Sequence, residues 1–182
     1  MAPSLTRREA LGGAAAAVLL GSCGGGDPPP AGGPRPGSGA ALLGSLLALE
    51  HAVVAAYGAC EEMLRGDALR EARAIREQER SIAGRLETAI VGLGGDPPTG
   101  KSAEEYARSF PRLRSAADAL HFADDLEQTQ LRAYLDALAD FPTAGARSTA
   151  ADIAAGHASH LAAIRVLRGL PAAEGPFVTG AL

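Results

Sequence analysis

Five residues that can bind a metal interrupt otherwise apolar segments of this 182-residue sequence: Glu50, Glu79, Glu127, His157 and His160. A carboxylate among apolar side chains is costly unless it is hydrogen-bonded, paired with a cation or coordinated. Imidazole and carboxylate groups together suit iron, manganese or zinc. The residue types therefore predict a buried polar cluster with the donor set of a metal site.

The spacing of these residues places each of them on the apolar face of a predicted helix. The three glutamates fall in three different segments, and the two histidines stand one turn apart in a fourth. Residues three and four apart share a helix face. The apolar residues about one turn to either side are Leu47 and Val53, Ile75 and Ile82, Ala123 and Leu131, and Ile153 and Leu161.

Four segments carry apolar residues at helical spacing, and none shows the alternation that is typical of strands. The predicted helices cover residues 40–65, 68–93, 115–139 and 149–170. The core is expected to consist of Leu, Ile, Val and Ala, because the sequence has no Trp and only 4% aromatic residues. These features predict an all-α fold.

The connections between the helices predict their topology. Gly66 and Asp67 form a short joint, so the first two helices should be antiparallel neighbours. Residues 94–114 form a much longer link, in which Ser102 and Glu105 make a capping box for one short helix. About eight residues join the last two helices. A four-helix bundle with one long connection between its second and third helices matches the ferritin-like arrangement better than a simple up-and-down bundle.

The sequence resembles the ferritin-like superfamily, in the form found as an uncharacterised domain of bacterial lipoproteins. The resemblance covers most of residues 40–170 and rests on LEHAVVAAY (49–57), EQER (77–80) running on to Leu86, Leu126-Glu127 with Tyr134, and AAGHASHL (154–161). In di-iron members, two helices each contribute a Glu and the other two each contribute Glu-x-x-His. The resemblance implies that Glu50, Glu79, Glu127 and His160 occupy ligand positions.

Two positions depart from this di-iron pattern. Ile82 stands where the second helix should carry its histidine, and His157 stands where the fourth helix should carry its glutamate. An isoleucine cannot ligate a metal, and an imidazole in place of a bridging carboxylate removes one way of holding two irons together. The remaining three Glu and two His could still hold one metal, or two with open positions.

Two functions from different classes fit this pattern. The departures slightly favour a ferritin-like module with an incomplete or altered di-iron-type site, decayed and retained for a binding or structural role in the cell envelope. The alternative is a metalloprotein that binds iron or manganese for metal oxidation, storage or peroxide and oxygen chemistry. Whether the protein is an enzyme stays open at this point, as does the identity of any metal cofactor.

Simpler interpretations of the polar residues also stay open. Each glutamate could pair at a bundle edge with Arg73, Arg76, Arg80 or Arg132. The two histidines could form a hydrogen-bonded core pair without any metal.

Residues near the cluster have expected secondary roles. Tyr57 and Tyr134 lie on core faces, and their hydroxyls are expected to bond a buried glutamate. His51 points about 100° away from Glu50, so we expect it at the surface or behind the site. His121 lies off the face of its helix that carries Glu127, and we assign it no role.

The first 22 residues have the features of an export signal. Arg7 and Arg8 resemble a twin-arginine motif, but Ala10 stands where a bulky apolar residue is expected, so the export route stays open. The apolar run 11–20 is too short to span a bilayer, which needs about 20 apolar residues. It ends in Leu-Gly-Ser-Cys23, which is similar to a lipobox cut before the cysteine. Residues 1–22 are therefore interpreted as a removed signal peptide.

The rest of the chain then has a lipid anchor, a tether and one domain. Cys23 is the expected lipidation site, residues 23–39 are a Gly/Pro-rich tether and residues 40–182 are the ferritin-like domain. These features predict an exported protein that is lipid-anchored on the extracytoplasmic face of the cell membrane. Besides the membrane, the partner is expected to be a second copy of the chain or an envelope protein.

Charge and cysteine content exclude other classes. The net charge of −4 argues against a nucleic-acid partner, which would require a basic patch. Once Cys23 carries lipid, Cys60 is the one remaining cysteine, so no intramolecular disulfide stabilises the mature chain.

Overall fold

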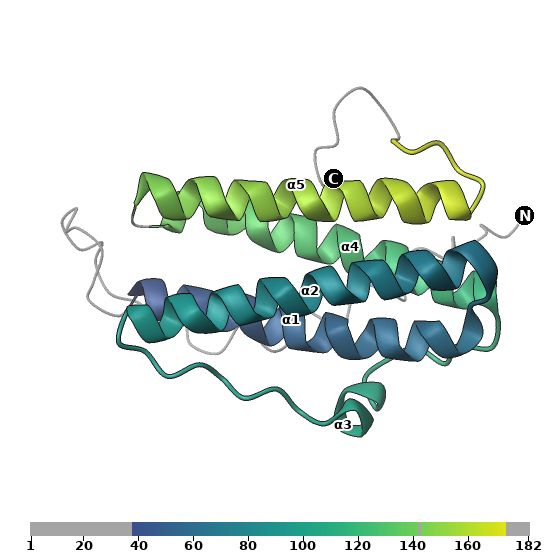
Figure 1. Cartoon of the computed structure of the whole chain (residues 1–182), viewed down its shortest axis with the longest axis horizontal. Coiled ribbons are helices and arrows are strands. Elements are labelled where there is room, and N and C mark those ends of the chain that lie inside the picture. The colour runs from purple at the N-terminus through teal and green to yellow at the C-terminus, as the bar shows by residue number, and fades with distance from the viewer. Residues whose placement is uncertain (1–37, 142, 174–182) are drawn as a thin grey trace, which may run out of the picture. The chain divides into compact units, whose positions relative to one another are not determined.

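The computed structural model describes residues 38–141 and 143–173, and within these ranges the chain is helical without any strand (Figure 1). The helices are α1 Ser38–Met63, α2 Gly66–Gly92, α3 Ala103–Ala107, α4 Ala116–Ala137 and α5 Ala144–Leu167, with a 3-10 turn, η2, at Leu138–Asp140. The prediction of an all-α, ferritin-like bundle is confirmed. The predicted signal peptide and Cys23 lie outside the described residues, as does the tether except for its end, where α1 begins at Ser38.

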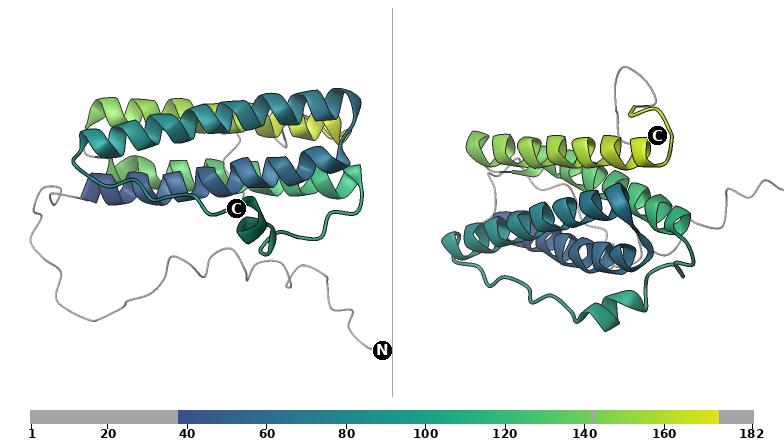
Figure 2. Two further views of the ribbon diagram at one scale, coloured as in Figure 1. Left: turned by 60° about the horizontal axis from the view of Figure 1, so that its bottom comes forward. Right: turned by 45° about the vertical axis from the view of Figure 1, so that its right-hand side comes forward.

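The four long helices form two antiparallel hairpins, α1 with α2 and α4 with α5 (Figures 1 and 2). Gly66 has a φ of +59°, a conformation that glycine adopts without steric cost, and this lets the chain reverse between α1 and α2. The long link then runs back along the bundle, so that α2 and α4 point the same way. Its short helix α3 packs against α1.

The predicted capping box is present at the start of α3. The Ser102 hydroxyl oxygen accepts a hydrogen bond from the Glu105 backbone N–H over 3.2 Å, and the Glu105 carboxylate accepts one from the Ser102 backbone N–H over 2.9 Å. The first turn of this five-residue helix therefore has satisfied donors although none of its residues is buried.

Helix α5 begins at Ala144, earlier than the predicted residue 149. The Thr143 side chain caps it by accepting from the Ala146 N–H over 3.1 Å. Most of the first turn is exposed, so it carries no apolar stripe that a sequence pattern could reveal. The helix ends at Leu167, before the predicted end at residue 170, and Gly169, whose φ is +72°, follows it.

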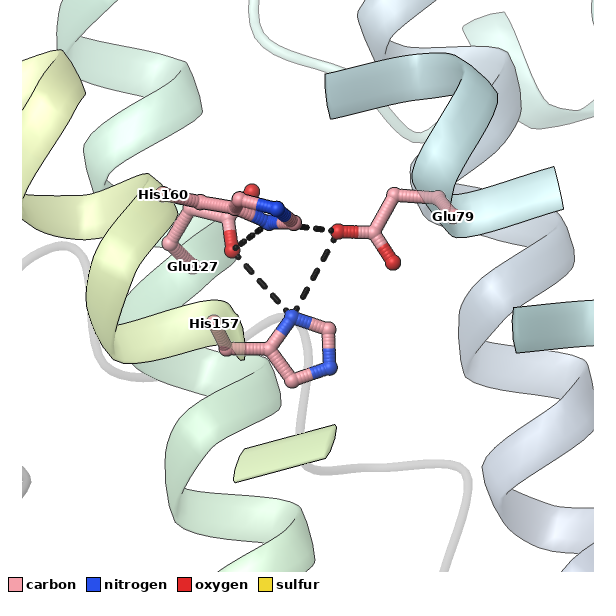
Figure 3. A group of neighbouring side chains, drawn as sticks. All are labelled: Glu79, Glu127, His157 and His160. Carbon is pink, nitrogen blue, oxygen red and sulfur yellow. Dashed lines mark hydrogen bonds and ion pairs between the residues drawn. The ribbon is translucent and has the colours of Figure 1, made fainter. Parts of the chain in front are cut away.

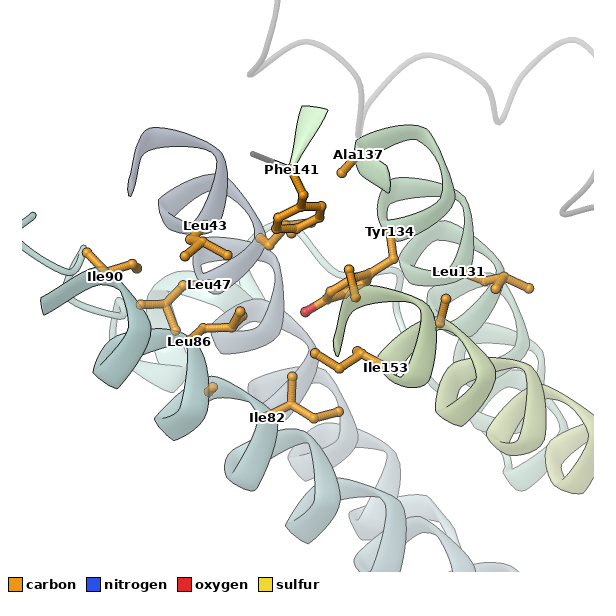
Figure 4. Packing of buried hydrophobic residues seen from close by; sticks show 14 residues of the cluster. Leu43, Leu47, Ile82, Leu86, Ile90, Leu131, Tyr134, Ala137, Phe141 and Ile153 are labelled. Atoms are coloured by element: carbon orange, nitrogen blue, oxygen red, sulfur yellow. The ribbon is translucent and has the colours of Figure 1, made fainter. Parts of the chain in front are cut away.

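Two apolar clusters fill the bundle and leave a polar layer between them. Figure 4 shows the first cluster, which includes Leu47, Ile82 and Ile153. The second includes Val53 and Ile75. Along every long helix the predicted site residues lie between members of the two clusters. Apolar packing on both sides therefore isolates the polar layer from solvent at the bundle ends.

Not every apolar residue at a helix end reaches the core. Leu93 and Ala116 continue the apolar stripes of the second and third predicted helices, but both are exposed, because they lie at or beyond the ends of α2 and α4. Within the described residues, one helix, Gly39–Met63, has the length and composition to cross a membrane. In this structure it packs against α2 and α4 and buries Glu50.

Candidate metal centre

All five predicted site residues converge in the polar layer. Glu50 comes from α1, Glu79 from α2, Glu127 from α4, and His157 and His160 from α5. The first four side chains are fully buried, and His160 is 6% exposed. Sequence spacing therefore placed every one of these side chains in the interior of the bundle.

Four of the five residues form a closed ring of nitrogen and oxygen atoms (Figure 3). His157 Nδ1 lies 3.4 Å from Glu79 Oε1 and 3.3 Å from Glu127 Oε2. His160 Nδ1 lies 3.0 Å from Glu79 Oε1 and 3.4 Å from Glu127 Oε2. All four atoms lie within 4.8 Å of one another. Each imidazole thus faces both carboxylates, and each carboxylate faces both imidazoles.

Glu50 lies on the other side of the His157 ring. Its Oε1 is 3.7 Å from His157 Nε2, the nitrogen that points away from the ring of four. The Tyr134 hydroxyl donates to Glu50 over 2.5 Å. The Gln130 amide, with its nitrogen turned toward the carboxylate, donates to both Glu50 oxygens over 3.3 and 3.0 Å. Glu50 therefore has its own hydrogen-bond donors, Tyr134 and Gln130, and its carboxyl also lies within hydrogen-bonding reach of Glu79.

The two tyrosines behave as predicted. Tyr57 donates its hydroxyl proton to Glu127 Oε1 over 2.5 Å, as Tyr134 does to Glu50. The alternative partners Arg73 and Arg76 pair instead with Glu61, and Arg80 pairs with Glu77. His51 lies outside the cluster, 3.4 Å from Glu87.

Two residues around the site were missed from the sequence. Gln130 is three residues after Glu127 on the same face of α4, a signal that was available. Gln78 lies on the exposed side of α2, and its Oε1 is 2.9 Å from His160 Nε2. Nothing in its position along α2 indicates this contact, because the bond crosses to a helix far away in sequence.

In the absence of a metal, the positive charges of the two imidazoles offset the negative charges of the buried carboxylates. Burial opposes the charge on His157, but its hydrogen bonds with the three surrounding glutamates prevail and raise its pKa to about 11. Burial likewise opposes the charge on His160, and its bonds with Glu127 and Glu79 raise its pKa to about 9. Burial acts to raise the pKa of Glu79, but its bonds with the two histidines lower it to about 2. In the metal-free protein both imidazoles are therefore cations at neutral pH.

Glu50 has the opposite tendency. Burial raises its pKa to about 7, and the neighbouring charge of Glu79 acts in the same direction. The contacts of Glu50 with His157 and Tyr134 act to lower its pKa, but burial outweighs them.

The spacing of the donor atoms fits a single metal ion. With metal–ligand bonds of about 2.1 Å, neighbouring ligands at angles of about 90–109° lie about 3.0–3.4 Å apart. The four N···O distances of the ring, 3.0 to 3.4 Å, cover the same interval. Without a metal, each Nδ1–H must be shared between two carboxylates. Glu79 Oε2 is buried and has no N–H donor among the described residues, and the carboxyl group within hydrogen-bonding reach of Glu79 is that of Glu50.

The fold and this buried His/Glu cluster together define a ferritin-like domain protein. The chain belongs to the ferritin-like domain family, whose model matches residues 38–170. A similar solved structure is the crystal structure of a conserved hypothetical protein, rv2844, from Mycobacterium tuberculosis. It has 20% sequence identity and a TM-score of 0.65, and the match covers 71% of this chain and 96% of that one. This likeness concerns the fold alone. The search of curated proteins gave no match.

Proposed function

We propose that this protein is an exported, lipid-anchored ferritin-like protein that binds one divalent metal ion through Glu79, Glu127, His157 and His160. The observation that carries the proposal is the closed ring of four buried donor atoms within 4.8 Å of one another. The preferred ions are iron or manganese, with zinc also compatible with imidazole and carboxylate ligands. Bound iron or manganese would supply one-electron redox chemistry in a site shielded from water, and zinc would not.

The geometry favours one ion over two. Glu50 approaches His157 from the side of Nε2, the nitrogen that faces away from the ring of four, and it is not among the donors that converge within 4.8 Å. Ile82 packs into an apolar cluster with Leu47 and Ile153, so the second helix offers no imidazole there. Glu50 then acts behind the site, where its carboxylate lies 3.7 Å from His157 Nε2 and favours the ring orientation that turns Nδ1 toward the other ligands.

Metal titration of the purified protein tests this proposal. We expect one Mn²⁺ or Fe²⁺ per chain, with about two protons released per ion at pH 7, because both imidazoles are protonated in the metal-free protein. Calorimetry in buffers of different ionisation enthalpy measures the released protons, and elemental analysis measures the metal. Two ions per chain would contradict the single-site geometry, and no binding of iron, manganese or zinc would contradict the proposal.

A second function is favoured by the charge balance of the cluster. Most of the carboxylate oxygens already accept hydrogen bonds from the two imidazolium groups, the tyrosine hydroxyls or Gln130. This supports a decayed di-iron-type site retained in a binding or structural module of the envelope. The absence of metal binding in the titration is the result that this second function predicts.

The membrane anchor is supported by the sequence around Cys23. We expect that Cys23→Ala moves the protein from the membrane fraction to the soluble fraction, because a diacyl or triacyl anchor contributes about 0.8 kcal/mol per buried methylene. Fractionation with immunodetection measures the distribution, and Cys60→Ala serves as the control for loss of a cysteine elsewhere. Unchanged membrane partition of Cys23→Ala would rule out the lipid anchor. A second copy or an envelope protein remains the proposed partner.

A further inference from the structure

His160 is the point at which the buried ring comes closest to solvent. Glu79, Glu127 and His157 have no exposed surface, whereas His160 is 6% exposed. His160 lies on α5 and faces Glu79 on α2, so its outer edge lies at the seam between these two helices. Any cation that reaches the ring must pass this side chain or open a more closely packed part of the bundle.

Of the four neighbouring pairs of long helices, α2 and α5 approach each other along the shortest stretch of backbone. Helix α1 packs extensively against α2, and α4 packs extensively against α5. Helices α1 and α4 also make a substantial contact, whereas α2 and α5 touch sparsely. Farther along the same seam lies an open groove of about 450 Å³, lined by Asp67 and Glu71 of α2 and by Ala162 and Ala163 of α5. Arg70 also lines this groove, so its three charged groups sum to a net negative charge.

One hydrogen bond closes the seam beside the ring. His160 Nε2 donates to Gln78 Oε1 over 2.9 Å, from α5 across to α2. Gln78 is exposed, while the imidazole that it holds is buried. Because Gln78 accepts from Nε2, the other nitrogen of the imidazole, Nδ1, is kept facing Glu79 and Glu127. Outer hydrogen bonds of this kind orient metal-binding histidines in general.

We infer that the seam between α2 and α5 is the route by which a divalent cation reaches the ring, and that Gln78 is the latch that holds the His160 ring in place across it. Rotation of the His160 side chain would open the ring on the side of the seam without moving any fully buried ligand. Gln78 is thus a positioning residue that acts through His160. The role in cation exchange depends on the proposed metal site.

The latch is tested by the rate at which metal-loaded protein loses Mn²⁺ or Zn²⁺ to excess EDTA. We expect that Gln78→Ala accelerates release at least about tenfold and weakens binding by about 10–100-fold, the usual cost of losing such an outer hydrogen bond. Gln78→Glu keeps an acceptor for Nε2–H and should release at close to the wild-type rate. Glu77→Ala, which removes an exposed neighbour on the same helix, is the matched control.

A second measurement needs no metal. Nitrogen-resolved NMR of histidine side chains should show a slowly exchanging Nε2–H of His160 in wild type and Gln78→Glu but not in Gln78→Ala, with His157 unchanged. Persistence of that signal in Gln78→Ala would overturn the latch whatever the metal results. If wild type binds metal and all variants release it equally fast, the latch is wrong and the metal site stands. If wild type binds no metal, the proposed function and the cation route both fail.

Discussion

Replacing Glu79 by alanine should lower the free energy of unfolding of the metal-free protein by about 3–5 kcal/mol, because it leaves two buried imidazolium groups without one of their carboxylates. Glu79 has no exposed surface and contacts both His157 and His160. A loss of this size is a large part of the about 5–15 kcal/mol that stabilises a typical domain. Urea denaturation in the presence of a chelator measures it.

The matched control for this variant is Glu77→Ala, on the same helix but with a side chain that is 75% exposed. Its effect should stay within about 0.5 kcal/mol. Equal losses for the two variants would show that the Glu79–histidine contacts contribute nothing particular to stability.

The difference between wild type and Glu79→Ala should also depend on pH. The pKa of Glu79 falls from 4.5 to about 2 on folding, so its contribution is present above pH 4.5 and is lost as the pH falls through 2. The pKa of His157 rises from 6.5 to about 11, so its contribution is complete below pH 6.5 and is lost as the pH rises through 11. The difference should therefore be largest between pH 4.5 and 6.5.

Addition of Mn²⁺, Fe²⁺ or Zn²⁺ should raise the melting temperature of the wild-type protein, and Glu127→Ala should abolish this rise. An ion that binds only the folded state stabilises it by about 2.7 kcal/mol at a hundredfold excess over Kd. For a domain of this size that corresponds to about 5–10 °C. Each variant is compared with itself with and without metal, because Glu127→Ala also changes the metal-free stability. Asp125→Ala, an exposed change on the same helix, should retain the rise.

The same melts separate the two proposed functions. No shift in wild type, together with a shift in the double variant Ile82→His with His157→Glu, would support a decayed di-iron-type site. That double variant restores the two positions at which the sequence departs from the di-iron pattern. A rise in wild type that Glu127→Ala removes would exclude decay.

Much of the fold could be predicted because its signals are local in the sequence. The apolar stripes predicted the four long helices, and Gly66, which marked the joint between the first two, has a positive φ. The interior position of the five site residues followed from helical periodicity alone. The start of α5 could not be predicted, since its exposed first turn has no stripe and only Thr143 marks it.

The internal organisation of the site could not be read from spacing. Periodicity assigns a residue to a face, but it does not say which nitrogen of His157 meets which carboxylate. The contact of Glu50 with the outer nitrogen of His157 depends on the position of that imidazole, and the Gln78–His160 bond depends on how two helices are placed side by side. Both are properties of the assembled bundle.

The long link between α2 and α4 has a consequence for how the protein folds. Each hairpin consists of contacts that are local in sequence, whereas joining the hairpins requires closure of the link, with an entropic cost that grows only slowly with its length. Glu50 and Glu79 belong to the first hairpin, and the other three site residues belong to the second. The contacts of Glu127 with the two histidines lie within the second hairpin. The contacts of Glu79 with the histidines join the two hairpins, so they form only at the docking step. Loss of the Glu79–histidine contacts should therefore change the docking of the hairpins late in folding, and with it the rate of unfolding.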